Sequence, residues 1–294
     1  MRRILVTGAR GLLGSSLVPY LQERGHHVLS HGRTGDVAIR GDLSDPAQAR
    51  AALSQASPDV IVNLVALTNV DTCEQSPQEA YLANVRVVEN LGRWIEETHN
   101  RCHLIQLSTD QVYDGPGPHS ENDITLTNYY GFSKYAAELA AAAVQSTVLR
   151  TNFFGPSRCA NRVSLSDWLF LSLRKGDPIT VFDDVRFSPL SLQRLTELLE
   201  IVIVNGQAGV FNLGSREAMS KADFAFALAA SLGLPTQNMK RGSSGAVKLV
   251  AYRPKDMSMN SSLFEKAFDV RLPTLSEEIN SVGAAYVHET QWSS

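Results

Sequence analysis

A tyrosine and a lysine stand four residues apart in Tyr130-Gly-Phe-Ser-Lys134. Residues at this spacing share one face of a helix, so the phenol and the amine would be neighbours. An unperturbed tyrosine has a pKa of about 10, and a nearby cation lowers it, so the pair could transfer a proton near neutral pH. The spacing alone is weak evidence, because a packed tyrosine beside a solvated lysine shows the same letters. Its weight comes from the strand-like segment before it, which ends in Ser108-Thr109-Asp110.

A second group of residues could bind phosphate. Three glycines in Gly8-Ala-Arg-Gly11-Leu-Leu-Gly14 follow a short apolar run and precede a helical segment. Gly8 permits a tight turn, Gly11 lets the backbone approach a diphosphate, and Gly14 allows close helix packing. The free amides at the start of the helix would face the anion. We therefore predict a dinucleotide site, with an ordinary strand-to-helix turn as the alternative.

The residues after the second predicted strand bear on the choice of cofactor. NAD sites usually place Asp or Glu there to bind the ribose 2′-hydroxyl, and such an acid repels the 2′-phosphate of NADP. This chain has Ser30-His-Gly-Arg33-Thr34, with no acid and with an arginine that can bind phosphate through two hydrogen bonds. We therefore expect NADP(H), with NAD(H) as the alternative if Arg33 is only a solvated loop residue.

Strand-like and helix-like segments alternate through the first half of the chain. Apolar runs typical of buried parallel strands cover residues 4–6, 27–30, 60–65, 103–107 and 147–149. Segments of helical composition cover residues 12–23, 46–55, 77–97 and 130–144. The alternation predicts an α/β fold, namely a Rossmann-type doubly wound parallel sheet with a smaller C-terminal substrate-binding lobe.

The pattern changes after Arg150, where glycines and prolines mark frequent turns. Residues 191–204 are typical of one more helix, and residues 209–214 of a strand that could return to the main sheet. We expect an NAD(P)-binding domain over residues 1–155, to which residues 184–214 return. Residues 156–183 and 215–294 would form the substrate-binding lobe, in which the pattern resolves few elements.

Composition and charge argue against several other classes of protein. The formal net charge of −3 provides no broad basic field for nucleic acid or an anionic membrane. Three cysteines far apart and seven scattered histidines favour neither a disulfide framework nor a metal site. The apolar run at the N-terminus is too short for a signal peptide core or a membrane span. We expect a cytoplasmic protein that acts on a small molecule.

The spacing Gly-x-x-Gly-x-x-Gly resembles the extended short-chain dehydrogenase/reductase family. Gly41-Asp42-Leu43, Asn63-Leu-Val-Ala66 and Asn84 resemble that family's segments beside the adenine, along the cofactor and in the following helix. The likeness covers most of the chain. It implies cofactor contacts at Gly8, Arg10, Gly11, Leu12, Leu13, Gly14, Arg33, Asp42, Leu43, Ala66, Asn84, Tyr130 and Lys134.

Within that family, the chain most resembles the dTDP-4-dehydrorhamnose reductase group. The strings that carry this resemblance are Thr68-Asn-Val70-Asp71-Thr-Cys-Glu74, Leu107-Ser108-Thr109-Asp110-Gln-Val-Tyr-Asp114-Gly115 and Tyr252-Arg253-Pro254-Lys-Asp-Met-Ser258. The resemblance implies NADPH-dependent reduction of a carbonyl, namely the 4-keto group, on a nucleotide-linked sugar. Tyr130 would protonate the carbonyl oxygen as hydride arrives from the nicotinamide, and Thr109 would hydrogen-bond that oxygen. Lys134 would lower the pKa of the phenol and bind the nicotinamide ribose.

The same resemblance implies substrate contacts at Thr68, Val70, Asp110, Asn152 and Arg253. Arg253 could bind a substrate anion or form a surface ion pair. The chain departs from the group at Leu67 and over residues 151–155 and 183–189, which lie near the substrate in that group. The reaction class therefore carries over while the particular sugar does not.

Other members of the family have different roles. A 4,6-dehydratase needs a carboxylate base where this chain has Gln111, and an amide is not basic enough. A sugar-nucleotide epimerase with retained NAD stays open, although Arg33 favours an exchangeable NADPH. A non-catalytic, NADP-binding regulatory subunit resembling the β subunit of methionine adenosyltransferase also stays open. The helices predicted over residues 77–97 and 130–144 could form a homodimer surface or pack on the sheet.

Overall fold

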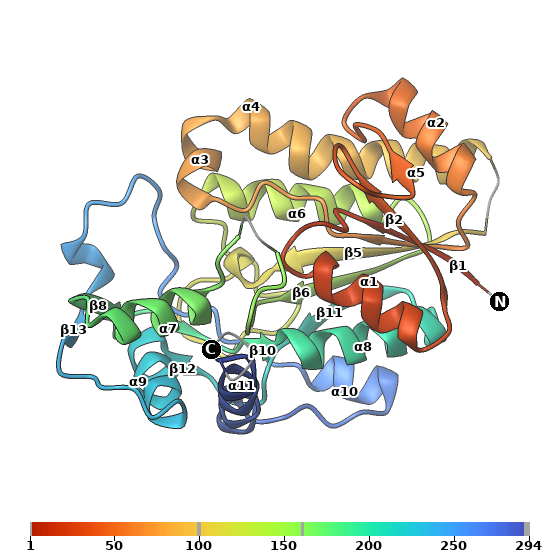
Figure 1. Ribbon diagram of the computed structural model, residues 1–294. Coiled ribbons are helices and arrows are strands. Elements are labelled where there is room, and N and C mark those ends of the chain that lie inside the picture. Colours follow the sequence, from red (N-terminus) through yellow and green to blue (C-terminus); the bar gives the residue numbers. More distant parts are fainter. Residues whose placement is uncertain (1, 99–100, 160–161, 291–294) are drawn as a thin grey trace.

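The computed structural model describes residues 2–98, 101–159 and 162–290. Its centre is a seven-stranded sheet in the order β11-β6-β5-β4-β1-β2-β3, in which every neighbouring pair is parallel (Figure 1). The strands are β1 (Arg3–Thr7), β2 (His27–Gly32), β3 (Ile39–Arg40), β4 (Val60–Asn63), β5 (His103–Thr109), β6 (Ser146–Thr151) and β11 (Gly209–Leu213). The strand order reverses between β1 and β4, so the predicted doubly wound parallel sheet is confirmed.

Helices cover both faces of this sheet (Figure 1). Leu5 and Leu104 of the strands pack against one set of helices, α2 (Pro46–Ala56), α5 (Val87–Glu97) and α6 (Tyr129–Ala141). Val6 and Ile105, their neighbours in sequence, pack against the opposite set, α1 (Gly14–Glu23), α8 (Leu192–Asn205) and α10 (Ser262–Phe268). Because successive strand residues point to opposite faces and both faces are covered, apolar residues on these strands are buried on both sides of the sheet.

A second apolar cluster lies beside the carboxyl ends of the main strands, on the left in Figure 1. Its helices are α7 (Leu165–Lys175), α9 (Lys221–Ser231) and α11 (Leu275–Thr290). Three short strand pairs accompany it: β7 (Phe153–Phe154) with β10 (Leu190–Ser191), β8 (Ile179–Phe182) with β13 (Met239–Gly242), and β9 (Arg186–Phe187) with β12 (Met219–Ser220). Phe224 of α9 packs edge-on against Phe154 of β7 and Phe187 of β9, which joins two of these pairs to the helices.

The element boundaries differ from the expectation in several places, of which α6, ending at Ala141 rather than at residue 144, is one. Helix α1 begins at Gly14 rather than at residue 12, because the glycine turn occupies the residues before it. Strand β4 ends at Asn63 rather than at residue 65. The helix predicted over residues 77–97 consists of α4 (Pro77–Ala80), a π-helical turn η1 (Tyr81–Arg86) and α5, and α3 (Val70–Gln75) precedes it. Single π-helical turns often mark functional sites, and η1 carries Asn84.

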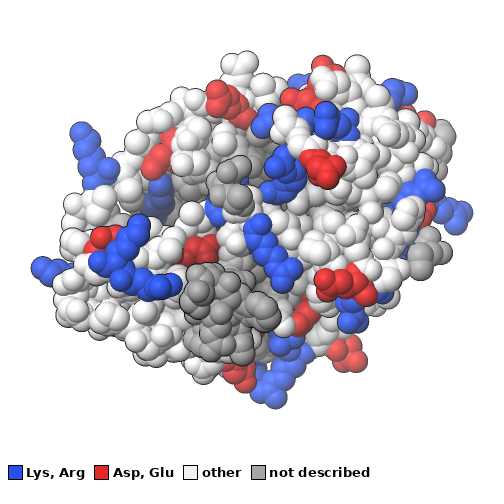
Figure 2. All heavy atoms as spheres, in the orientation of Figure 1, with Lys and Arg blue, Asp and Glu red and all other residues white. Residues whose placement is uncertain are grey.

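On the face drawn in Figure 2, positively and negatively charged side chains are mixed. There, Lys and Arg side chains of the described residues alternate with Asp and Glu rather than forming one continuous basic area. None of the helices within the described ranges is long and apolar enough to cross a membrane. The same ranges contain no cluster of three or more His, Cys, Asp or Glu side chains suited to hold a metal ion.

Candidate active site

The turn after β1 is so tight that two of its glycines have no room for a side chain. Gly8 has a φ of +65°, and a Cβ there would lie 3.1 Å from the backbone carbonyl carbon of Leu64. A Cβ on Gly14 would lie 2.6 Å from the carbonyl oxygen of Gly8. The amide of Gly11 closes the turn by donating to that same oxygen at 2.9 Å. The spacing of the glycines therefore produces a bare backbone loop between β1, β4 and α1.

This loop presents unused amide donors at the start of α1. Leu13, the residue before the helix, makes no side-chain cap. Among the described residues, the amides of Leu12 and Leu13 donate to no acceptor. Amides at a helix N-terminus attract anions through their hydrogen-bonding capacity and the helix dipole. A diphosphate fits this donor set, because it supplies the missing acceptors and the glycines leave its path clear.

The loop that follows β2 contains Arg33 and is contacted by two further arginines, Arg10 and Arg40. Arg10 of the glycine turn donates to the carbonyl of Thr34 at 3.2 Å, and Arg40 donates to the carbonyl of Gly35 at 2.9 Å. A Cβ on Gly35 would collide with the Arg10 guanidinium. The Arg33 side chain is exposed and forms no hydrogen bond or ion pair with the described residues. Its guanidinium is therefore available to an incoming anion.

Asp42 and Leu43 lie between β3 and α2. The Asp42 carboxylate accepts hydrogen bonds from the amide and hydroxyl of Ser44 at 2.9 and 2.7 Å. Burial raises the pKa of Asp42, but these hydrogen bonds and the charge of Arg33 bring it below its usual value. Asn90 of α5 donates to the carbonyl of Leu43 at 2.9 Å. The segment is thus held rigidly at the same end of the sheet as the arginines.

Asn84 fixes the backbone beyond the end of β4. Its Oδ1 accepts from the amide of Leu67 at 2.7 Å, and its Nδ2 donates to the carbonyl of Leu67 at 3.1 Å. The second Nδ2 hydrogen goes to the hydroxyl of Ser133 in α6 at 2.8 Å. Both amide hydrogens are used, so Asn84 positions the segment that contains Ala66 rather than offering a free donor.

The helix that carries the tyrosine and lysine approaches the end of β5 unusually closely. Asn128 caps α6 by accepting from the amide of Gly131 at 2.8 Å. A Cβ on Gly131 would collide with the carbonyl oxygen of Gln111. Only glycine fits there. Because Gly131 has no side chain, α6 packs close to the end of β5 and brings Tyr130 and Lys134 to it.

Tyr130 lies beside Thr109, the last residue of β5. Both side chains are buried, at 8% and 4% exposure. Burial raises the pKa of the Tyr130 phenol well above its usual value; a hydrogen bond with Thr109 opposes this, and the charge of Asp110 adds to it. The phenol therefore keeps its proton near neutral pH and can act as a proton donor.

Lys134 is buried one helical turn beyond Tyr130. Its Nζ donates to the carbonyl of Leu107 in β5 at 2.6 Å. Burial lowers the pKa of its amine to about 8, and the charge of Glu138 opposes this. The sequence leads us to expect that Lys134 lowers the pKa of Tyr130, but in the structure burial dominates and the pKa of the phenol is raised.

Asp110 is a fully buried carboxyl next to the tyrosine and threonine. Its Oδ2 accepts from the Nδ2 of Asn152 at 2.7 Å, and its Oδ1 accepts from the Thr109 hydroxyl at 3.3 Å. Burial raises its pKa to about 6, against the hydrogen bond from Asn152 and the charge of Lys221. Two of the residues expected to contact substrate, Asp110 and Asn152, are therefore in direct contact with each other.

The remaining residues expected to contact substrate lie around the same end of the sheet. Val70 packs with Tyr130 and Ala251 in a small apolar cluster. Arg253 forms an ion pair of 3.0 Å with Asp71, whose other oxygen accepts from the amide of Ala251. The Thr68 hydroxyl is exposed and accepts from Arg162 at 3.3 Å. Asp71 thus ties residues 251–253 to α3 across the site, a role that its position in the sequence motif does not reveal.

A buried ion pair lies behind Lys134. Glu138, one turn later in α6, accepts three hydrogen bonds from the Arg150 guanidinium of β6, and both side chains are 3% exposed. The hydroxyl of Ser108 in β5 also donates to Glu138. Arg150 donates in addition to the hydroxyl of Tyr113 at 2.8 Å. The pair locks α6 to β5 and β6 beneath the site; it was not apparent from the sequence, although its glutamate follows the lysine by one helical turn.

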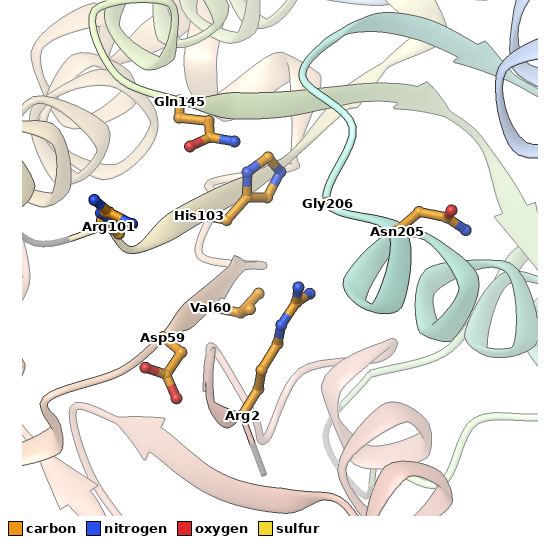
Figure 3. Close-up of a pocket in the computed structure, with 8 residues that line it drawn as sticks. All are labelled: Arg2, Asp59, Val60, Arg101, His103, Gln145, Asn205 and Gly206. Carbon is orange, nitrogen blue, oxygen red and sulfur yellow. The ribbon is translucent and has the colours of Figure 1, made fainter.

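A cavity of about 500 Å³ lies at the opposite, amino ends of the strands. Arg2 extends into it close to His103 (Figure 3). Arg2 donates to the carbonyl of Ile203 at 2.7 Å, and the His103 Nε2 is 2.7 Å from the Thr147 hydroxyl. Ligands of doubly wound sheets bind at the carboxyl ends, so this cavity is separate from the candidate site.

Comparisons with known proteins agree with this architecture. The family model described as the RmlD substrate binding domain matches residues 1–287. A dTDP-4-dehydrorhamnose reductase of Streptomyces griseus is 30% identical over 280 residues, which is 90% of this chain and 88% of the relative. The methionine adenosyltransferase 2 subunit beta of Rattus norvegicus is 28% identical over 286 residues, 90% of this chain and 82% of that protein.

A solved structure extends the likeness to three dimensions. The dTDP-4-dehydrorhamnose reductase of Bacillus anthracis in complex with NADP superposes with a TM-score of 0.86, covering 96% of this chain and 98% of that one. At 21% identity this likeness shows the fold. The family model, by contrast, spans nearly the whole sequence. The chain therefore belongs to the RmlD-like branch of the extended short-chain dehydrogenase/reductase family, a family of NAD(P)-dependent oxidoreductases.

Proposed function

We propose that this protein is an NADPH-dependent reductase of a carbonyl group on a nucleotide-linked sugar, with a 4-keto sugar of the dTDP-4-dehydrorhamnose type as the substrate class. The main support for the proposal is that Thr109, Tyr130 and Lys134 lie together at the carboxyl end of β5. All three are buried, and the phenol retains its proton. A protonated phenol beside a second hydroxyl can stabilise a substrate carbonyl oxygen that gains negative charge.

The cofactor would lie across the glycine turn. Its diphosphate would bind the amides of Leu12 and Leu13, in the turn formed by Gly8, Gly11 and Gly14. Its 2′-phosphate would bind Arg10 and Arg33. Asp42 and Leu43 would bound the adenine, and Ala66, which Asn84 holds through the backbone, would line the path to Tyr130 and Lys134. When bound, NADPH supplies a hydride to the carbonyl carbon of the substrate.

The chain's own residues would supply the proton and hold the substrate oxygen. Tyr130 would donate its phenolic proton to the carbonyl oxygen, and Thr109 would donate a hydrogen bond to the same atom. Lys134 already donates one hydrogen to Leu107. Its two other hydrogens would be available to the cofactor ribose. Glu138 and Arg150 would act as positioning residues, because they fix the helix and strands that carry this group.

The substrate would occupy the space between the main sheet and the second cluster of helices. We propose that residues 1–155, with 184–214, form the cofactor-binding part, and that residues 156–183 and 215–294 form the substrate-binding part. Thr68, Val70, Asp110, Asn152 and Arg253 would contact the sugar nucleotide. Arg253, which is paired with Asp71 but partly exposed, would meet a phosphate of the nucleotide.

The test is NADPH consumption by the purified protein with a panel of dTDP-4-keto-6-deoxy sugars, compared with NADH. We expect turnover that depends on the sugar and is faster with NADPH. Tight NADPH binding without turnover of any sugar would instead support a regulatory subunit, a candidate favoured by the 28% identity to the methionine adenosyltransferase 2 subunit beta. A pull-down of methionine adenosyltransferase would then decide for that role. Isomerised sugar without net NADPH consumption would indicate an epimerase.

Replacing Arg33 with Ser tests the choice of cofactor. The exposed Arg33 guanidinium forms no hydrogen bond or ion pair with the described residues, so its loss should mainly weaken the contact with the 2′-phosphate. We expect the KM for NADPH to rise about tenfold, which corresponds to one charge-assisted hydrogen bond of about 1.4 kcal/mol, while the KM for NADH stays unchanged. Arg50→Ser, on the exposed side of α2, serves as the matched control. An equal change for both cofactors would contradict the assignment.

A further inference from the structure

The cavity at the amino ends of the strands, called the amino-end cavity below, has a volume of about 500 Å³. Its lining comes from residues at the starts of β1, β4 and β5 and at the end of α8, segments that are far apart in the sequence (Figure 3). Two arginines and one aspartate supply its charged groups, so the lining is net positive. The proposed cofactor and substrate would bind at the opposite edge of the sheet and leave this cavity without a function.

Both arginines of the amino-end cavity have hydrogen-bond donors to spare. The Nη1 of Arg2 donates to the carbonyls of Ile203 and Val204 at 2.7 and 3.1 Å, at the end of α8. Its Nε and Nη2 form no hydrogen bond with the described residues. Arg101 is exposed and makes no side-chain hydrogen bond or ion pair within the described ranges. Guanidinium groups with free donors are suited to bind phosphate or carboxylate.

The carboxylate in the lining, that of Asp59, does not neutralise these arginines. Its Oδ2 accepts from the backbone amide of Arg3 at 2.7 Å. Figure 3 shows the carboxylate pointing away from the ring of His103. Within the part of the chain that the structure describes, Asp59 forms no ion pair. The region around His103 therefore keeps an excess of positive charge.

His103 adds a hydrogen-bond acceptor to the lining. Its side chain is 6% exposed, and its Nε2 lies 2.7 Å from the hydroxyl of Thr147. That hydroxyl donates its only hydrogen to the carbonyl of Gln207 at 2.5 Å, so the Nε2 of His103 must carry the proton. Burial and the charge of Arg2 lower the pKa of the ring, which keeps it neutral and makes Nδ1 an acceptor. This buried Nδ1 has no hydrogen-bond partner among the described residues.

We propose that the amino-end cavity is a second binding site, which takes a phosphate group that still carries a proton. The anionic oxygens of the phosphate accept hydrogen bonds from Arg2 and Arg101, and its P–OH donates to the Nδ1 of His103. The phosphate is either the free ion or the terminal group of a small molecule. The site is independent of the proposed reductase activity, because none of its residues belongs to the candidate active site.

The unpaired Nδ1 selects a protonated phosphate over other anions. A carboxylate or a sulfate would satisfy the two arginines, but neither carries a proton near neutral pH. The Nδ1 would then stay buried without a partner, which costs binding free energy. A site built to bind a hydroxyl group strongly rejects the analogue that lacks it. Discrimination between phosphate and sulfate is therefore the signature of this site.

The experiment is calorimetric titration of the purified protein, saturated with NADPH, because an open cofactor turn would also attract phosphate. We expect inorganic phosphate to bind with a Kd of about 1 mM or tighter, which a few charge-assisted hydrogen bonds provide. Sulfate should bind at least about tenfold more weakly. Thymidine monophosphate, titrated in the same way, identifies the source: tighter binding than that of inorganic phosphate supports a small molecule, and weaker binding supports the free ion.

Two variants assign the binding to this cavity. Arg101→Ser removes a guanidinium that has no structural partner, so it should weaken phosphate binding about tenfold and leave the unfolding temperature unchanged. His103→Leu removes the Nδ1, so phosphate and sulfate should then bind alike. Arg241→Ser, at an exposed arginine of β13, should match the wild-type protein.

Three results would overturn the inference and leave the proposed function standing. They are the absence of saturable phosphate binding, equal affinity of the wild-type protein for phosphate and sulfate, and unchanged phosphate affinity in Arg101→Ser. The third result would place the phosphate elsewhere on the protein. Because Arg101 is exposed and unpaired, this variant remains a valid test even if His103→Leu fails to fold.

Discussion

Tyr130→Phe is expected to lower kcat for the NADPH-dependent reduction of a dTDP-4-keto-6-deoxy sugar by roughly 10²–10⁴-fold, the usual contribution of a positioned proton donor. The substitution removes only the phenolic oxygen, and the ring remains packed with Val70 and Ala251. Burial holds the pKa of this phenol above its usual value, so it is in the donor form throughout the neutral range. Stopped-flow measurement of NADPH oxidation under single turnover would measure the change in the chemical step.

The adjacent tyrosine offers a matched control for this variant. Tyr129 lies on the same helix, but 42% of it is exposed, and its ring contacts Phe132 rather than the catalytic group. Tyr129→Phe should therefore keep the wild-type kcat. Both variants should bind NADPH with unchanged affinity, as followed by the fluorescence of the cofactor. If Tyr130→Phe retained wild-type turnover, another group would have to supply the proton.

Arg150→Met is expected to lower the free energy of unfolding by about 3–5 kcal/mol, the typical cost of leaving one member of a buried ion pair unpaired. Glu138 would remain buried, at 3% exposure, and would lose three hydrogen bonds and its ion-pair partner. Urea unfolding monitored by circular dichroism would measure the effect. The exposed pair Arg241 and Asp223 provides the comparison, because Arg241→Met should cost only about 0–1 kcal/mol.

A second substitution tests whether the loss comes from the stranded charge. Arg150→Met combined with Glu138→Leu removes both charges and fills the space with apolar groups. Replacing a buried pair in this way is often neutral for stability. We therefore expect the double variant to recover most of the free energy lost in Arg150→Met. A double variant as unstable as the single one would show that hydrogen bonds to Ser108 and Tyr113, rather than the charge of Glu138, dominate.

The parts of the site that the sequence predicts are those that local geometry determines. The glycine turn and the Tyr130 to Lys134 spacing each lie within a few residues, where backbone sterics and helical periodicity decide the arrangement. The strand order follows from the alternation of strand and helix, because parallel strands need crossover helices. These features can therefore be predicted from a single sequence.

Long-range contacts explain what the sequence could not predict. The pairing of Asp71 with Arg253 joins residues 182 positions apart. The π-helical turn η1 is equally hidden, because its letters suit an α-helix and only the tertiary contact of Asn84 with Leu67 distinguishes it.

The return of β11 to the sheet also limits how the chain can be divided. β11 pairs with β6 over five residues, from Gly209 with Thr147 to Leu213 with Thr151. A fragment that stopped near residue 155 would leave β6, a strand whose six residues are all buried, as an open edge. Unprotected edges of that kind recruit strands from other molecules. The N-terminal half is therefore a poor candidate for expression alone, since aggregation would compete with its folding.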